Sequence, residues 1–316
     1  MKQIARTCLR SSVAPLVTVT LLATVAEAEI FSYEVSKIIS YTQSSAATPT
    51  NGQSWLFNTS LYYGVPDEVL SASVSFDVPP PVILELYPAT PTFHIYYSGF
   101  YASQAELDAE YPSTTYALTI DRGTGPETAD VFLPVDLYCP EIPYFTGDTY
   151  DRLQSYDPAL PLDVYINGFT LPPGANVGVT LLSVSEEQTG SVLSTNLNPD
   201  ETHFQIPAGT LQPSRNYVIG ISYLSSLQIP GAGLGGATSA ASFSRGTAIY
   251  FTTLPVLGDC NADGAVNLTD YSGFPACLTG PGGGVGGSSC ACFDIDEDAD
   301  TDLADFAALQ TLVAGA

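Results

Sequence analysis

Residues 211–223 read LQPSRNYVIGISY and decide the fold class of this 316-residue chain. Pro213 and Asn216 are turn residues, and the Tyr, Val and Ile that follow are residues that strands prefer. The segment therefore predicts a turn that opens an apolar β-strand. Residues 248–253 form one further strand of the same character, so this part of the chain is expected to be β-sheet.

Short apolar runs separated by turn residues continue over residues 29–256, which is the pattern of an all-β sandwich. Only one helix stands out, because Ser103 and Glu106 form a capping box and Pro112 ends the turn that they open. The clearest strand candidates are residues 70–76, 82–86, 93–97, 116–120, 164–166, 177–184, 217–223 and 248–253.

Composition divides the chain into four parts. Prolines gather among Asp and Gly at residues 140–161 without a sustained alternating pattern, which indicates a boundary there. We therefore expect a signal peptide (1–28), a β-sandwich-like module of unknown family (29–145), a second β-sandwich (146–256) and a small α-helical calcium-loop domain (257–316). The predicted fold class is mainly β, with tandem β-sandwich modules before the helical domain.

The first 28 residues have the pattern of a secretory signal peptide. Lys2, Arg6 and Arg10 precede a largely apolar stretch, and residues 26–28 read Ala-Glu-Ala, which is a small-x-small cleavage site. The apolar run at residues 13–25 is too short for a membrane-spanning helix, which needs about 20 residues. The protein is therefore expected to be secreted and not to be an integral membrane protein.

Charge narrows the possible partners. Eight Lys and Arg against 33 Asp and Glu give a formal charge of −25. Nucleic-acid binding requires basic residues that neutralise phosphates, so nucleic acid is excluded as a partner. Ten of the acids lie in residues 257–316, which contain no Lys or Arg. This local excess indicates either a disordered acidic tail or a cation site.

The spacing of these acids favours a cation site. Residues 259–270 fit the calcium-loop template D-x-[DN]-x-[DN]-G-x₅-E, except for Asp at the last position. Calcium prefers about six to eight oxygen ligands on a loop that wraps around it. The expected ligands of the first site are the side chains of Asp259, Asn261, Asp263 and Asp270, the backbone carbonyl of Ala265, and Asn267 at the ninth position.

A second copy of the loop begins 35 residues later. Ala299 replaces Gly at the sixth position and must adopt a backbone conformation that is costly for a residue with a Cβ atom. Thr301 replaces the apolar Val266 of the first copy, so we expect the second site to be weaker or more distorted. Its expected ligands are the side chains of Asp294, Asp296, Asp298, Asp302 and Asp305, and the backbone carbonyl of Asp300.

Apolar residues follow each loop at helical spacing, and Pro275 must keep the first helix short. These positions are Leu268, Tyr271 and Phe274 after the first loop, and Leu303, Phe306, Leu309 and Leu312 after the second.

A calcium loop and a helix, duplicated within about sixty residues of an exported protein, closely resemble a dockerin module. The resemblance implies two calcium-dependent F-hand motifs and a cohesin-like or other extracellular scaffold protein as partner. Many dockerins carry a hydroxyl pair at loop positions ten and eleven. In this chain those positions are Leu268-Thr269 and Leu303-Ala304, so the chain departs from the family where cohesin is recognised.

The L-x-P-x-x-x-Y pattern of residues 211–217 resembles the tyrosine corner of fibronectin type III domains, in which a Tyr hydroxyl bonds to the backbone upstream. The early-strand Trp that is usual in that family is missing, since Val164, Tyr165 and Ile166 occupy its place. The resemblance implies a fibronectin type III-like architecture for residues 146–256, without membership of the family.

Four of the five Cys after residue 28 lie in residues 257–316, and export permits disulfides. A bridge between Cys290 and Cys292 is geometrically poor, because only one residue separates them. Two connectivities remain, each joining one of Cys260 and Cys277 to Cys290 and the other to Cys292. The fifth, Cys139, is left unpaired. Zinc is disfavoured, because this region lacks His and is rich in carboxylates.

The sequence assigns no catalytic residue. His94 and His203 lie in strand-like segments, where a surface or hydrogen-bonded role is expected, and no nucleophile motif is found. The acids Glu106, Asp108 and Glu110 are expected to decorate the exposed side of the short helix.

Two Tyr pairs, Tyr62-Tyr63 and Tyr96-Tyr97, offer rings that can stack on sugars, although strand alternation places only one member of each pair on an outer face. Our first hypothesis is a secreted, non-catalytic β-sandwich protein whose calcium module attaches it to an extracellular assembly. The alternative is a polysaccharide-degrading O-glycosyl hydrolase or a carbohydrate-binding component that docks through the same module. Whether the chain is an enzyme stays open, with the non-catalytic hypothesis favoured.

Overall fold

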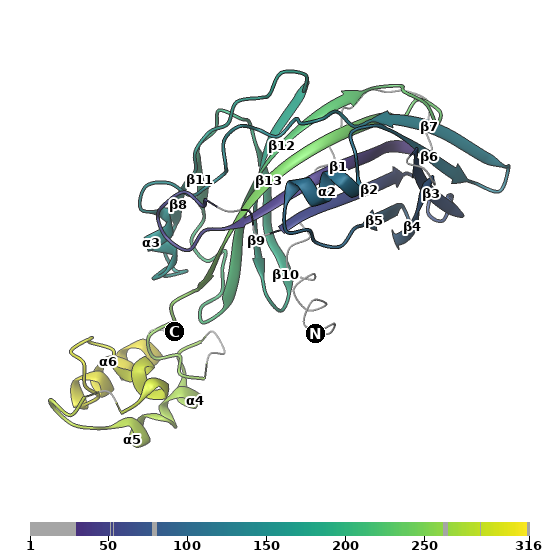
Figure 1. Ribbon diagram of the computed structural model, residues 1–316. Helices are drawn as coiled ribbons and strands as arrows, with labels where there is room; N and C mark the ends of the chain where they lie inside the picture. Colours follow the sequence, from purple (N-terminus) through teal and green to yellow (C-terminus); the bar gives the residue numbers. More distant parts are fainter. Residues whose placement is uncertain are drawn as a thin grey trace.

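The protein has a large, curved β-sheet and a small helical unit that follows it in the chain (Figure 1). The computed structural model describes residues 30–50, 52, 54–77, 81–261, 265–284 and 286–314. The predicted signal peptide lies outside the described residues. Strands predominate in the described part, so the prediction of a mainly β protein is confirmed. None of the helices in this part is long and apolar enough to span a bilayer.

Strands lie between residues 30 and 252, and most of the helices follow them in the chain. The strands are β1 Ile30–Thr42, β2 Ser54–Tyr63, β3 Ser71–Phe76, β4 Val82–Thr90, β5 Phe93–Tyr97, β6 Thr115–Asp121, β7 Pro126–Phe132, β8 Leu162–Tyr165, β9 Val177–Glu186, β10 Gly190–Leu197, β11 His203–Ile206, β12 Asn216–Ile229 and β13 Thr238–Thr252. The helices are α2 Gln104–Glu110, α3 Thr149–Leu153, α4 Leu268–Tyr271, α5 Phe274–Cys277 and α6 Leu303–Ala314, with a 3₁₀ helix η1 at Ser288–Phe293.

Most strands belong to one continuous sheet. Its order is β10-β9-β12-β13-β1-β2-β5-β4-β3-β6-β7, and β11 and β8 pair separately. The sheet is continuous because β1 pairs in parallel with β13, from Ser32 opposite Thr238 to Thr42 opposite Ala248. The long strands β12 and β13 therefore join the first and second halves of the β-region (Figure 1).

The first hydrophobic core is rich in aromatic rings. Phe57 of β2 stacks on Tyr111 with ring centroids 4.1 Å apart, and Tyr116 of β6 packs against the same ring of Phe57 at 5.5 Å. Strand β4 pairs with β3 through its first half and with β5 through its second, so the sheet folds over and encloses these side chains.

Strand β13 contributes to two cores. Ala241 and Phe243 lie in the first core, whereas Ile249 and Phe251 lie in the second. Residues that the sequence places in the 146–256 module thus complete the core of the 29–145 module. Short-range alternation identifies a strand but does not indicate how far it extends past its own module.

The second core is sandwiched between two sheets. Val164 of β8 and Ile206 of β11 pack with Val184 of β9 and Ile219 of β12. The predicted tyrosine corner is present beside it, because the backbone N–H of Gln212 donates to Tyr217 Oη at 2.7 Å. A four-stranded sheet, β10-β9-β12-β13, over the smaller β11-β8 sheet gives this half a fibronectin type III-like arrangement.

Buried polar groups hold residues 143–145, which connect the two halves of the β-region, against the sheet. The side chain of Gln43 donates to the carbonyl of Phe145 at 2.9 Å and accepts from the N–H of Phe145 at 2.8 Å. Thr247 Oγ1 donates to the carbonyl of Pro143 at 2.6 Å. Hydrogen-bonded polar groups are tolerated in such buried positions.

The predicted helix near residue 103 is confirmed as α2. Ser103 Oγ accepts from the N–H of Glu106 at 3.2 Å, and the Glu106 carboxylate accepts from the N–H of Ala102 at 3.1 Å. The expectation that Asp108 merely decorates the exposed side was wrong. Asp108 pairs with the buried amine of Lys37 at 2.5 Å, because a charge that faces a core requires an opposite charge.

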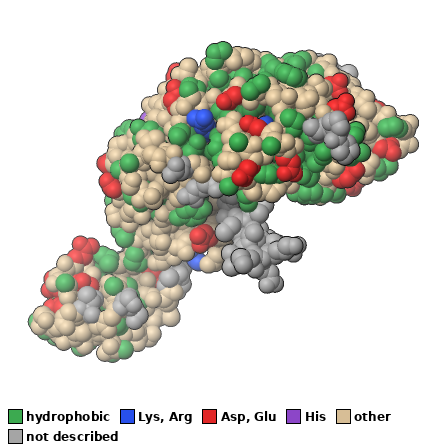
Figure 2. Space-filling model, in the orientation of Figure 1, with side chains coloured by type: hydrophobic (Ala, Val, Ile, Leu, Met, Phe, Trp, Pro, Cys, Tyr) green, Lys and Arg blue, Asp and Glu red, His purple; other side chains and the backbone are tan. Residues whose placement is uncertain are grey.

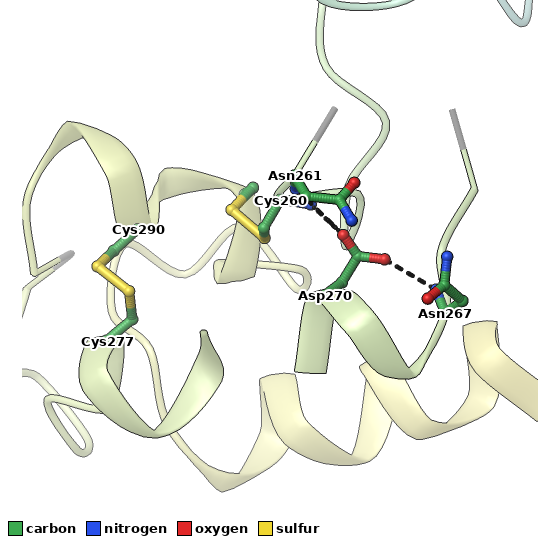
Figure 3. Close-up of a disulfide and its surroundings, with 7 residues drawn as sticks. Cys260, Asn261, Asn267, Asp270, Cys277 and Cys290 are labelled. Carbon is green, nitrogen blue, oxygen red and sulfur yellow. Dashed lines mark hydrogen bonds between the residues drawn. A yellow bond between two sulfur atoms is a disulfide. The ribbon is translucent and has the colours of Figure 1, made fainter. Parts of the chain in front are cut away.

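The helical unit contains α4, α5, η1 and α6 around a third core that includes Phe274, Phe293 and Leu309. Disulfides join Cys260 to Cys292 and Cys277 to Cys290, which is one of the two connectivities left open by the sequence (Figure 3). Cys139 is buried and, as expected, forms no disulfide with another described residue.

Candidate metal centre

The first loop is organised around the carboxylate of Asp270 (Figure 3). Its Oδ1 accepts from the backbone N–H of Cys260 at 2.9 Å and of Asn261 at 3.1 Å. Its Oδ2 accepts from the N–H of Asn267 at 2.9 Å. The buried twelfth residue therefore holds the second, third and ninth residues of the loop in place.

The second loop repeats this arrangement around Asp305. Oδ1 of Asp305 accepts from the N–H of Ile295 at 2.6 Å and of Asp296 at 3.2 Å. Oδ2 accepts from the N–H of Asp302 at 2.8 Å. These donors stand at loop positions two, three and nine, so the repeat seen in the sequence is also a repeat of backbone geometry.

The ninth residue of each loop opens the helix that follows. Oδ1 of Asn267 accepts from the N–H of Thr269 at 2.7 Å, and Oδ1 of Asp302 accepts from the N–H of Ala304 at 2.6 Å. Nδ2 of Asn267 also donates to the carbonyl of Ala265 at 3.1 Å. Both ninth residues therefore act as helix caps, and a cation at this position would be reached through water more readily than directly.

The second loop brings predicted ligands together in two overlapping groups. Asp294, Asp296 and Asp305 each offer a carboxylate oxygen, and these oxygens lie within 4.8 Å of one another. Asp298, Asp300 and Asp305 do the same. Oxygen donors at such separations can share a hard cation such as Ca²⁺, which coordinates them at about 2.3–2.6 Å.

Buried oxygens that lack a partner test whether a cation fits this loop. Oδ1 of Asp294 and Oδ1 of Asp300 are both buried, and neither has a hydrogen bond within the part of the chain that the structure describes. A buried carboxylate oxygen without a donor is costly, and a bound cation would satisfy it. Desolvation, together with the carboxylates of Asp298 and Asp305, also raises the pKa of Asp296. The donor set of the second loop therefore fits a cation that neutralises it.

The two departures of the second loop are both visible in the structure, although the expected weakening of the second site stays a prediction. Ala299 has φ = 70°, in the left-handed region that glycine adopts more easily. Thr301 is fully buried, and none of the described residues forms a hydrogen bond with its hydroxyl. Val266, at the equivalent position of the first loop, packs against the third core.

Not every predicted ligand of the first loop can be placed. Asp263 falls in residues 262–264, which lie outside the described residues. Asp259 is buried at the start of the loop, and Asn261 donates its N–H to Asp270. The assignment of all twelve ligands stays a prediction. The calcium-loop template predicts only the backbone carbonyl of Asp300 as a ligand. The Asp side chain at this position offers a carboxylate as well, and this residue type is visible in the sequence.

An apolar groove of about 440 Å³ lies between the helices of this unit. Leu268 and Leu303 open α4 and α6 at the tenth loop position, and their exposed fractions are 74% and 72%. Neither side chain belongs to the third core, so only part of the predicted apolar stripe is buried. The groove is lined by Leu268, Tyr271, Phe306, Leu309, Gln310 and Val313.

Figure 2 shows acidic side chains on both parts of the molecule and few basic ones on the same face. The groove is lined by uncharged residues, and the helical unit contains ten acids and no Lys or Arg, so the charge of the unit around it is negative. A partner that covers it would need to tolerate or neutralise carboxylates.

The two histidines have partners that account for them. His94 of β5 is buried, and its Nδ1 lies 3.0 Å from Tyr63 Oη. Exposed His203 of β11 lies 3.0 Å from Asp163 Oδ1, and Tyr165 stacks on its ring.

The Tyr pairs divide between the two faces of the sheet, as alternation predicts. Tyr63 lies in the first core, and Tyr96 packs against that core and bonds to Tyr111 Oη at 2.9 Å. Tyr62 and Tyr97 therefore occupy the opposite face and are partly exposed.

Comparison with known proteins found similarity only among solved structures. No family model matches the chain, and no curated protein matches it. The FN1–FN3 domains of chicken CNTN1 are 12% identical with a TM-score of 0.24, and the match covers 68% of each chain. A segment of two fibronectin type III domains from chicken tenascin is 14% identical with a TM-score of 0.19, over 59% of this chain and 90% of that one.

Proposed function

We propose that the protein is a secreted, non-catalytic β-sandwich protein whose C-terminal unit, residues 257–316, is a dockerin-like module that binds two Ca²⁺ ions. The observation that carries this proposal is the repeated geometry of Asp270 and Asp305, each of which holds the amides of loop positions two, three and nine. Two loops with the same spacing and the same backbone contacts are difficult to explain as an unstructured acidic tail.

Calcium suits the donors better than other common metals. The ligands are carboxylate, amide and carbonyl oxygens, which favour hard cations, and the four Cys of the unit are joined in disulfides. In the second loop Asp294, Asp296, Asp298 and Asp305 would hold the ion. In the first, Asp259, Asn261, Asp263 and Asp270 would do so, with the carbonyl of Ala265.

Bound cations would stabilise the folded unit. Each Ca²⁺ would offset the repulsion between clustered carboxylates. Because the ion would bind only the folded unit, its binding free energy would add to the free energy of unfolding. The third core is small, so metal and disulfides together compensate for its limited burial. Calcium in the extracellular medium would then keep the unit competent to attach the β-region to a scaffold protein.

The exposed groove supports an attachment role. Leu268, which lines the groove, and Leu303, which is not part of its lining, occupy the tenth position of each loop, where many dockerins carry a hydroxyl residue. Both side chains are largely exposed. The proposed partner is therefore a cohesin-like or other extracellular scaffold that offers an apolar surface.

A second candidate function is carbohydrate binding on the outer face of the β-region. Tyr62 stacks on Phe93 with ring centroids 4.4 Å apart, and Tyr97 lies on the same face. Burial raises the pKa of Tyr62 and of Tyr97, and the Glu34 carboxylate adds to both shifts, which indicates that Glu34 lies nearby. Aromatic rings can stack on sugar rings, and a carboxylate beside them can accept hydrogen bonds from the sugar hydroxyl groups. Affinity electrophoresis in polysaccharide gels, with Tyr62→Ala and Tyr97→Ala as comparisons, distinguishes this candidate from the first.

The calcium proposal is tested by thermal unfolding of the full chain, with and without Ca²⁺ after chelation. Calcium should raise the temperature at which the wild-type helical unit unfolds. The loss of the helix signal in circular dichroism measures this temperature. Asp259→Ala combined with Asp294→Ala should remove the response. Glu106→Ala combined with Glu110→Ala removes two acids from α2 instead and should keep it. Equal unfolding of the wild type in chelator and in millimolar Ca²⁺ would contradict the proposal.

A further inference from the structure

We propose that the Asp300 carboxylate is itself a cation ligand in the second loop, where the calcium-loop template supplies only a backbone carbonyl. This inference rests on the calcium-binding function proposed above. It concerns the seventh loop position, which the sequence assigns to the main-chain oxygen of Asp300.

The burial of Asp300 is the first observation. Its exposed fraction is only 5%, and Oδ1 has no hydrogen-bond partner among the described residues. Water would normally satisfy a carboxylate oxygen at a loop surface, and burial without a donor is costly. A cation beside Oδ1 supplies the missing positive partner.

The position of Asp300 among the other acids is the second observation. Asp298, Asp300 and Asp305 each present a carboxylate oxygen within 4.8 Å of the others. Three acids so close repel one another unless a cation lies among them. Asp305 belongs also to the group formed with Asp294 and Asp296, so the Asp300 carboxylate adjoins the predicted ligands of the loop.

The orientation of Asp300 is fixed from two sides. Its Oδ2 accepts from the backbone N–H of Gly282, and its own N–H donates to Asp298 Oδ1 at 3.1 Å. Gly282 belongs to the glycine-rich segment 279–284. This segment is bound to the second loop, because the N–H groups of Thr279 and Gly280 donate to the carbonyl of Thr301 at 2.9 and 3.1 Å. A carboxylate held by one oxygen while the other is unpartnered is prepared to bind a cation without rearrangement.

The first loop has no counterpart to this ligand. Ala265 occupies the seventh position there, and its carbonyl accepts from Nδ2 of Asn267. The expected ligands of the second site already include five carboxylates against three in the first, and Asp300 adds a sixth. Ligand charge is one of the properties that tune calcium affinity. The extra carboxylate opposes the weakening that the strain at Ala299 is expected to cause.

Calorimetric titration of the full chain with CaCl₂ tests the role of Asp300. Asp300→Asn keeps an oxygen for the Gly282 amide but removes the charge, and it should weaken one of the two sites about tenfold or more. Glu297→Gln removes an equal charge from an exposed residue of the same loop, which belongs to neither group of carboxylates, and should change affinity much less.

Asp300→Glu separates direct ligation from simple electrostatic attraction, because it keeps the charge but moves the carboxylate by one methylene. Direct ligation predicts that this variant also weakens the second site. If Asp300→Asn and Asp300→Glu bind two ions as tightly as Glu297→Gln, Asp300 is no ligand and the proposal is overturned, although calcium binding stands. If the wild type takes up no Ca²⁺, the proposed function itself fails.

Discussion

Asp270 and Asp305 accept hydrogen bonds from equivalent backbone amides, 35 residues apart in the chain. Each Oδ1 holds the second and third residues of its loop, at 2.9 and 3.1 Å for Asp270 and at 2.6 and 3.2 Å for Asp305. Each Oδ2 holds the ninth residue. Three of the roughly four acceptor positions of each carboxylate are thus used on the backbone, which leaves one for a cation.

Asp305→Ala should destabilise the helical unit even in chelator, because three backbone amides lose a charged acceptor. Bonds to charged groups contribute about 1.5–3 kcal/mol each, and partial replacement by water reduces the expected loss to about 2–4 kcal/mol in total. Chemical denaturation followed by helix circular dichroism measures it. Glu297→Ala in the same loop is the control, and an equal loss in both variants would contradict a specific structural role of Asp305.

Ala299→Gly should stabilise the second loop. The observed φ of 70° is costly for a residue with a Cβ atom and easy for Gly, and relief of that strain outweighs the greater chain entropy of Gly by about 0.5–1 kcal/mol. The midpoint of denaturation in Ca²⁺ should rise. Ala304→Gly, inside α6, should lower it by a comparable amount, and a fall in both variants would show that the backbone at Ala299 is not strained.

Thr301→Val should also stabilise the unit. The Thr301 hydroxyl is fully buried and has no hydrogen-bond partner in the described ranges of the chain, and Val has nearly the same shape. Removing an unsatisfied buried hydroxyl is worth about 1 kcal/mol. Thr311→Val is a suitable control, because the Thr311 hydroxyl is exposed and donates to the carbonyl of Ala307. A loss of stability in Thr301→Val alone would mean that its hydroxyl has a partner in solution.

His94 should make the β-region less stable in mild acid. Burial lowers the pKa of His94 below its usual value of 6.5, so the folded protein keeps the ring neutral while the unfolded chain takes up a proton. The stabilisation is therefore complete above about pH 6.5 and is lost as the pH falls from there through the folded-state pKa. Unfolding temperatures at pH 7.5 and 5.5 should differ less in His94→Gln than in the wild type. An unchanged difference in His94→Gln would contradict the assignment.

Local sequence patterns predicted individual elements better than their connections. The runs at residues 93–97 and 116–120 correspond to β5 and β6, because alternating apolar residues report directly on a half-buried strand. The run at 248–253 marked only the end of β13. The first half of β13, residues 238–244, is rich in Ala and Ser, which give a weak strand signal, yet it pairs with β1 and completes the first core.

The part of the candidate site that depends on the spacing of ligands along the chain could be predicted from the sequence. Positions one to twelve of each loop follow from a template, and the strained conformation of Ala299 follows from the missing Gly. The Asp300 side chain depends instead on Gly282, which approaches from a separate segment. Such a contact between segments has no local pattern, and neither does the ion pair of Lys37 with Asp108.

Equilibrium dialysis of the full chain against ⁴⁵Ca²⁺ counts the calcium ions that the protein binds. We expect two ions per chain at saturation, one ion after Asp259→Ala or Asp294→Ala, and none after both substitutions. Saturation at less than one ion per wild-type chain in millimolar calcium would contradict this expectation, and so would an unchanged uptake in the double variant.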